Sequence, residues 1–259
     1  MKRILLVALL VLVPLAPASA APKPFAGAGA GSSGPFDSAL AATRRGDFAS
    51  AVELYTTAID DRKAGQDDLA LAYGNRGAAH AELAQFQQAI ADYGRALALA
   101  PLNPHIRYNR AVAHSRVGRF AKAITDYRRV VQGFPGDPVA HAGLGFALFH
   151  QGRFSAAAKS FQNHLKLRPH DDEAALWLYL ARARAGRDGK GGLGRHLAAT
   201  VTAPDWRQTL AALHLGRATP SGVLAAAVKA EPRERQGRLA EAHFHIAERY
   251  LLRGDRAAA

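Results

Sequence analysis

The chain contains no cysteine among its 259 residues, which excludes disulfides, thiolate-ligated metals and cysteine nucleophiles. The one apolar run, Ile4–Leu15, is shorter than the ~20 residues that a membrane-spanning helix needs, which excludes a polytopic membrane protein. Neither G-x-S-x-G nor H-E-x-x-H occurs, and no carboxylates are placed as an acid–base pair. The sequence therefore predicts a protein that is not an enzyme and has no cofactor, no metal and no nucleic-acid partner.

The N-terminus has the pattern of a secretory signal peptide. Lys2 and Arg3 precede the apolar run, and Ala18-Ser19-Ala20 follows it with small residues. We predict a signal peptide at residues 1–20, cleaved after Ala20, a flexible linker at 21–34, and a periplasmic or secreted protein. No cysteine is available for a lipid, so no stable membrane anchor is expected. An uncleaved anchor or a buried helix is the alternative for this segment.

Positive charge is unevenly distributed. The whole chain has 34 Lys+Arg and 21 Asp+Glu, but residues 101–170 have 11 Lys+Arg and only 2 Asp+Glu. A basic middle segment favours an acidic partner or surface. Compositional bias towards arginine is the alternative explanation.

Internal repeats determine the predicted fold. Several residue types recur every 34 positions: Pro101, Pro135 and Pro169; Phe86, Phe120 and Phe154; Ala89, Ala123 and Ala157; Tyr93, Tyr127 and Phe161; and Gly77, Ala111 and Gly145. An earlier copy surrounds Gly46 and Tyr55. The aromatic columns lie seven residues apart, on one face of a helix that packs against a small residue on the preceding helix. Each copy is therefore a helix hairpin, and stacked hairpins bury a continuous core.

This period and set of columns resembles the tetratricopeptide repeat (TPR). The resemblance implies an all-α solenoid of stacked helix hairpins, with four repeats within residues 35–171 (32–65, 70–103, 104–137 and 138–171). We expect a helical C-terminal section at 172–259 with an incomplete final hairpin.

Within the C-terminal section, helices are expected at Glu173–Ala185, from Asp205 to Leu215, from Thr219 to about Lys229, and at Gln236–Leu252. The segment GRDGKGGLGRHL is rich in glycine and charge, which predicts a loop. The apolar residues of the last helix, which include Phe244, must be buried against another surface. Two alternatives stay open: packing near Trp206, or a homodimer.

The C-terminal segments WLYLARA, Trp206–Gly216 and EAHFHIAERYLLRGD are similar to NlpI-type TPR proteins of the bacterial envelope. That resemblance implies partners such as cell-wall hydrolases or an envelope protease. The absence of a lipid-bearing cysteine departs from the family pattern.

The first helices of stacked repeats line a concave face, and helical periodicity places a candidate partner-binding groove there. Asparagine at this face offers donors and an acceptor to an extended peptide, and exposed aromatic residues are typical of partner sites. We predict an exported scaffold that binds a partner protein or peptide. The alternative is a binder of an anionic polymer or surface, such as peptidoglycan or acidic lipid, through basic repeats three and four. The predicted groove residues are Asn75, His105, Tyr108, Asn109, Val112, Arg116, Phe146, Phe149 and His150.

Overall fold

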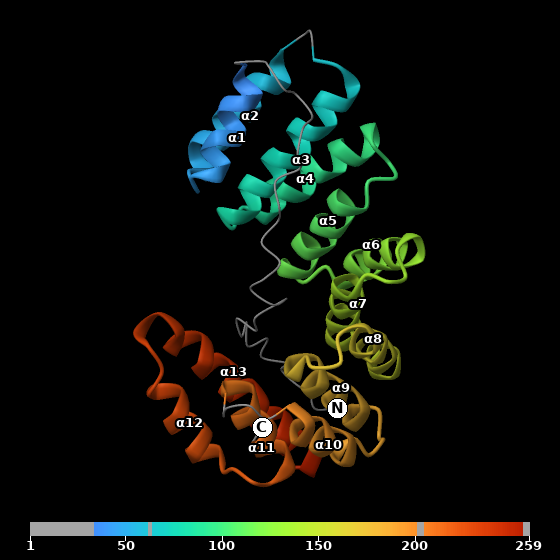
Figure 1. Ribbon diagram of the computed structural model, residues 1–259, viewed down its shortest axis with the longest axis vertical. Coiled ribbons are helices and arrows are strands. Elements are labelled where there is room, and N and C mark those ends of the chain that lie inside the picture. The colour runs from blue at the N-terminus through green and yellow to red at the C-terminus, as the bar shows by residue number, and fades with distance from the viewer. Residues whose placement is uncertain (1–33, 62–63, 201–204, 256–259) are drawn as a thin grey trace, which may run out of the picture. The chain divides into compact units, whose positions relative to one another are not determined.

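The computed structural model describes residues 34–61, 64–200 and 205–255, in which it contains thirteen helices and no strand. The chain divides between Leu167 and Arg168 into two compact units. The predicted signal peptide (residues 1–20) and most of the predicted linker (residues 21–34) lie outside the described residues. The predicted all-α fold is confirmed (Figure 1).

The N-terminal unit consists of four successive helix hairpins. They are α1 (Pro35–Arg44) with α2 (Phe48–Asp60), α3 (Gln66–Glu82) with α4 (Phe86–Leu99), α5 (Pro104–Arg116) with α6 (Phe120–Gly133), and α7 (Pro138–His150) with α8 (Phe154–Leu167). The second helix of each hairpin contacts the first helix of the next. The stack is the one that the 34-residue period predicts, with α3 beginning four residues before the predicted repeat boundary at 70.

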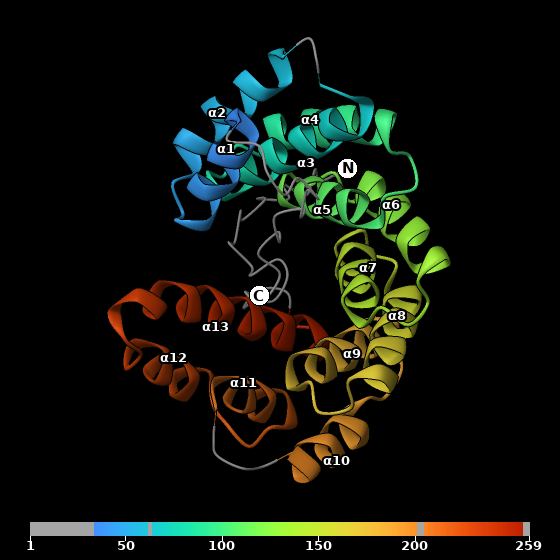
Figure 2. The same ribbon diagram turned by 45° about the horizontal axis from the view of Figure 1, so that its top comes forward.

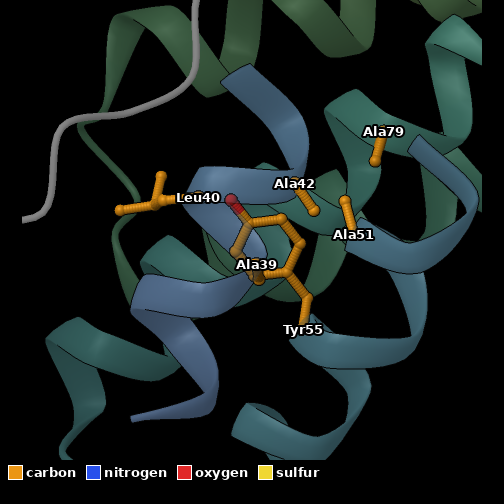
Figure 3. Close-up of a cluster of buried hydrophobic side chains, with 6 residues drawn as sticks. All are labelled: Ala39, Leu40, Ala42, Ala51, Tyr55 and Ala79. Carbon is orange, nitrogen blue, oxygen red and sulfur yellow. The ribbon is translucent and has the colours of Figure 1, made fainter. Parts of the chain in front are cut away.

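The aromatic column forms the centre of each hairpin. Tyr55, Tyr93 and Phe161 are completely buried, and Tyr127 is 2% exposed. In the first hairpin the Tyr55 ring lies among Ala39, Leu40, Ala42 and Ala51 (Figure 3). A Cβ at Gly77 would approach the Tyr93 ring to 2.9 Å, and one at Gly145 would approach the Phe161 ring equally closely. The small-residue column therefore exists because the ring of the second helix occupies that space.

The C-terminal unit consists of α9 (Asp172–Arg184), α10 (Lys190–Thr200), α11 (Trp206–Leu215), α12 (Pro220–Val228) and α13 (Pro232–Arg253). The long helix α13 contacts α9, α11 and α12, whereas α10 contacts α9 and α11. The predicted caps at Asp205 and Thr219 are present, since both side chains accept hydrogen bonds from backbone amides of the helices they begin.

Helix α10 corrects the predicted loop. Its three glycines give it a low intrinsic helix propensity, but Leu193 and Leu197 lie four residues apart on one face and are buried. His196 Nε2 also lies 2.8 Å from Asp172 Oδ1 of α9. The burial of Leu193 and Leu197 against neighbouring helices therefore stabilises α10 by more than its low helix propensity destabilises it.

Candidate functional site

The first helices of the repeats form one continuous surface, here called the first-helix surface. Helix α5 contacts both α3 and α7, and Figure 2 shows these three helices following one another along one side of the repeats. The predicted groove residues all belong to these helices or to their ends.

Three predicted groove residues do not lie open on this surface. Asn75 is 1% exposed, and Phe146 and Phe149 are each 5% exposed. The Phe146 ring packs edge-on against Phe161 at 5.2 Å, and Phe149 packs against Phe154 at the same distance. The prediction that they were exposed is therefore wrong. Ten consecutive residues of α7 are buried, so helical periodicity had no polar face from which to identify the open side.

The exposed residues of the predicted groove lie on α5. His105 and Arg116 are exposed at its two ends, and Tyr108, Asn109 and Val112 between them are half-buried. Together they form an open strip with a cation, an imidazole, an amide and an aromatic edge. Whether a partner binds this strip stays a prediction.

Three of the predicted groove residues also have structural contacts. The Tyr108 ring packs edge-on against Tyr127 at 5.5 Å, and burial raises the pKa of Tyr108. Asn109 lies beside the Tyr93 hydroxyl of the preceding hairpin. The half-buried His150 ring stacks on Phe120 with 5.1 Å between ring centroids, and burial lowers the pKa of His150. A neutral His150 adds no charge to the surface.

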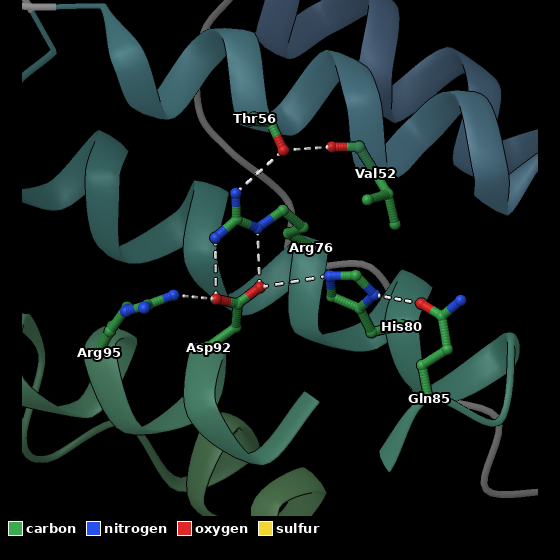
Figure 4. A network of polar contacts seen from close by, with 7 residues as sticks. All are labelled: Val52, Thr56, Arg76, His80, Gln85, Asp92 and Arg95. Atoms are coloured by element: carbon green, nitrogen blue, oxygen red, sulfur yellow. Dashed lines mark hydrogen bonds and ion pairs between the residues drawn. The ribbon is translucent and has the colours of Figure 1, made fainter. Parts of the chain in front are cut away.

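A buried ion-pair network joins the two helices of the second hairpin (Figure 4). The Arg76 guanidinium donates two hydrogen bonds to Asp92, of 2.7 and 2.9 Å, and a third to the hydroxyl of Thr56 in the first hairpin. Arg95 Nη1 donates to the same carboxylate at 2.9 Å, and His80 Nε2 lies 3.8 Å from it. The network orients side chains inside the stack and leaves no open carboxylate for chemistry.

The same pair recurs one repeat later and was missed by sequence reasoning. Arg110 donates two 2.8 Å hydrogen bonds to Asp126, and both residues are displaced by 34 from Arg76 and Asp92. That spacing was visible in the sequence as a fixed Arg column and a fixed Asp column. The next repeat has Leu144 and Ser160 at these positions, so the pair is confined to two hairpins.

The basic middle segment is electrostatically unbalanced. Its two carboxylates are occupied, since Asp126 pairs with Arg110 and Asp137 caps α7 through backbone amides at 2.8 and 3.2 Å. Eight cations of helices α5–α8 and their loops are exposed and form no ion pair with any described residue: Arg116, Arg119, Lys122, Arg128, Arg129, Arg153, Lys159 and Lys166.

The last helix, α13, packs against other helices of the C-terminal unit. The Phe244 ring lies 5.4 Å from Trp177 of α9, and the Trp206 indole donates a hydrogen bond to Glu241. These contacts match the alternative in which α13 packs near Trp206. Leu251 remains 38% exposed, and a homodimer stays a prediction.

Within the described ranges, no group of three or more histidine and acidic side chains is arranged to hold a metal ion. None of the helices in those ranges combines the length and apolar character needed to cross a membrane.

Comparisons with known proteins agree with the repeat assignment. Two family models, both described as tetratricopeptide repeat, match residues 75–138 and 115–176. No curated protein sequence matches the chain.

Solved structures of MamA proteins share the fold. MamA AMB-1 is 21% identical, with a TM-score of 0.56 over 64% of this chain and 87% of that chain. MamA from Desulfovibrio magneticus RS-1 is 19% identical, with a TM-score of 0.58 over 64% of this chain and 90% of that chain. The resemblance to NlpI-type proteins stays a prediction. The matched segments, the 34-residue columns and the stacked hairpins together identify residues 75–176 as tetratricopeptide repeats.

Proposed function

We propose that this protein is a non-enzymatic scaffold of the bacterial envelope that binds an acidic segment of a partner protein along α5. The observation that carries the proposal is the open strip on the first-helix surface, where exposed His105 and Arg116 flank half-buried Tyr108, Asn109 and Val112. Such a strip offers hydrogen bonds and an aromatic edge to an extended backbone.

Charge favours an acidic partner. Arg116 and the nearby Arg119 are exposed and unpaired among the described residues. An acidic segment would gain attraction there and associate faster at low ionic strength. A cell-wall hydrolase or an envelope protease is the kind of partner that the NlpI resemblance implies.

The envelope location rests on the sequence of residues 1–20, which has the three parts of a cleavable signal peptide. A periplasmic or secreted protein would meet partners of that compartment only.

A second candidate function is binding of an anionic polymer or surface, such as peptidoglycan or acidic lipid. It is favoured by exposed cations on the second helices, Lys122, Arg128 and Arg129 of α6 and Lys159 of α8. These cations lie outside the α5 strip, so the two functions predict different contact residues.

Site-specific photo-crosslinking separates the two functions. A benzoylphenylalanine at Arg116 of α5 should give a discrete protein adduct in cells, whereas one at the exposed Gln132 of α6 should give none. Arg116→Gln should then weaken binding of the identified partner by about tenfold, because a charge-assisted hydrogen bond is lost.

The matched control is the triple variant Lys122→Gln/Arg128→Gln/Arg129→Gln, which should retain the protein partner. Adducts from Gln132 alone, or loss of sedimentation with isolated cell-wall sacculi in the triple variant only, would favour the polymer instead.

A further inference from the structure

A cleft of about 380 Å³ lies within the C-terminal unit. Its walls come from the end of α9, the turn into α10, the end of α11 and the end of α13. Its lining includes the side chains of Tyr179, Arg187, Lys190, His214, Arg249 and Arg253. The volume lies within the range of pockets that hold small-molecule ligands and exceeds what an inorganic phosphate ion needs.

The cleft gathers four cations and one carboxylate. Arg187, Lys190, Arg249 and Arg253 line it together with Asp188. The Asp188 side chain is already engaged, because its Oδ1 accepts a 2.9 Å hydrogen bond from the Lys190 backbone amide. None of the four cations forms an ion pair with a carboxylate in the described part of the chain. Positive charge is therefore concentrated without internal compensation.

Arg249 is fixed in this position by its own hydrogen bonds. Its Nη1 donates to the carbonyl oxygen of Leu213 and, at 3.1 Å, to that of Ala218. Burial and the nearby Arg253 lower the pKa of Arg249, as expected where a guanidinium is held near a like charge. An anion between these groups would relieve both effects.

His214 provides a second, independent observation. It lines the cleft, is 5% exposed, and its Nε2 lies 3.1 Å from Nδ1 of the buried His245. Its other nitrogen, Nδ1, is buried without a hydrogen-bond partner among the described residues. Buried polar atoms are nearly always satisfied by protein, water or ligand, so this unsatisfied nitrogen indicates that the back of the cleft accommodates a polar group.

We propose that the cleft binds a small phosphorylated molecule whose phosphate or diphosphate group lies among Arg187, Lys190, Arg249 and Arg253. Guanidinium groups match phosphate oxygens in geometry as well as charge. Four cations facing one occupied carboxylate suit a ligand with more than one negative charge, and the remaining volume takes the organic part beside Tyr179. This site is separate from the proposed protein-binding strip on α5.

Isothermal titration calorimetry of the full chain with pyrophosphate tests the proposal, at about 0.1 M salt with sulfate as the competing anion. The double variant Arg187→Gln/Lys190→Gln removes two exposed cations of the cleft. It should raise the dissociation constant at least about tenfold, because two charge-assisted contacts are lost.

The matched control is Lys229→Gln/Arg233→Gln, which removes two exposed cations of the same unit outside the cleft. Its affinity for pyrophosphate should stay within about twofold of that of the parent. Its melting temperature, followed by tryptophan fluorescence, should equal that of the parent. Equal weakening in both double variants, equal affinity for sulfate, or no pyrophosphate binding at millimolar concentration would overturn the proposal.

Vesicles containing phosphatidylglycerol separate two sources of the phosphate group. Co-sedimentation that pyrophosphate reverses, and that the cleft variant loses, assigns a lipid head group to the cleft. Pyrophosphate binding without co-sedimentation assigns a soluble phosphorylated ligand. Vesicle binding that the cleft variant retains and pyrophosphate does not reverse would contradict a lipid at this site.

Discussion

Ala84 adopts a left-handed backbone with φ of 57°, at the position between two helices where Gly118 has φ of 73° and Gly152 has φ of 77°. A residue with a Cβ is strained there by about 1 kcal/mol. We expect Ala84→Gly to raise the free energy of unfolding by about that amount and Gly118→Ala to lower it similarly. Urea denaturation followed by circular dichroism measures both; a destabilised Ala84→Gly variant would contradict the strain.

Also at the residue scale, the exposure of the candidate site residues was predicted correctly at some positions and wrongly at others. His105 and Arg116 lie at the ends of α5 and are exposed as expected. Asn75, on α3, is buried, although it has the same position in its repeat as Asn109. Two asparagines in one sequence column therefore differ in exposure, which the repeat position alone does not reveal.

At the scale of elements, helices α11 and α13 join through the buried His214–His245 contact, with Tyr179 of α9 against the His214 ring at 5.3 Å. Burial, helped by Arg249 and Lys190, lowers the pKa of His214 to about 3, and burial also lowers the pKa of His245 well below its usual value. Both rings are therefore neutral in the folded protein at mildly acidic pH.

This pair predicts acid sensitivity of the C-terminal unit. An unfolded histidine takes up a proton near pH 6.5, whereas the folded pair does not until far lower pH. The unfolded state thus binds more protons in this interval, so the pair's contribution to stability is full above pH 6.5 and falls as pH drops, by about 1.4 kcal/mol per pH unit for each histidine. Glu173 and Glu248, whose pKa values burial raises, act in the opposite direction.

Nuclear magnetic resonance of the imidazole rings isolates the histidine contribution from that of the glutamates. The His214 and His245 rings should stay neutral from pH 8 to 5. Melting followed by fluorescence should show the accompanying loss of stability, because Trp177 and Trp206 both lie in this unit. Titration of either buried ring near pH 6.5 would contradict the prediction.

At the scale of the whole molecule, the chain combines two folded units with an N-terminal segment outside the described residues. We expect the exported protein to begin at Ala21, because the small residues at Ala18–Ala20 suit signal peptidase. Intact mass spectrometry of the protein recovered from the periplasm or medium measures this. A mass that retains Met1 would count against both cleavage and the proposed location.

The repeated hairpins can be predicted from the sequence alone, because contacts within a hairpin recur at fixed offsets and appear as columns of similar residues, such as Tyr93 and Tyr127 at a spacing of 34. The tertiary structure was needed to show that α7 is buried on all sides, because a helix that is apolar all round has no periodicity to read. It also decided that α10 is a helix, through the burial of Leu193 and Leu197. The cleft was beyond sequence reasoning for a related reason: Lys190, His214 and Arg249 come from three separate helices, and no repeat spacing connects them before the chain folds.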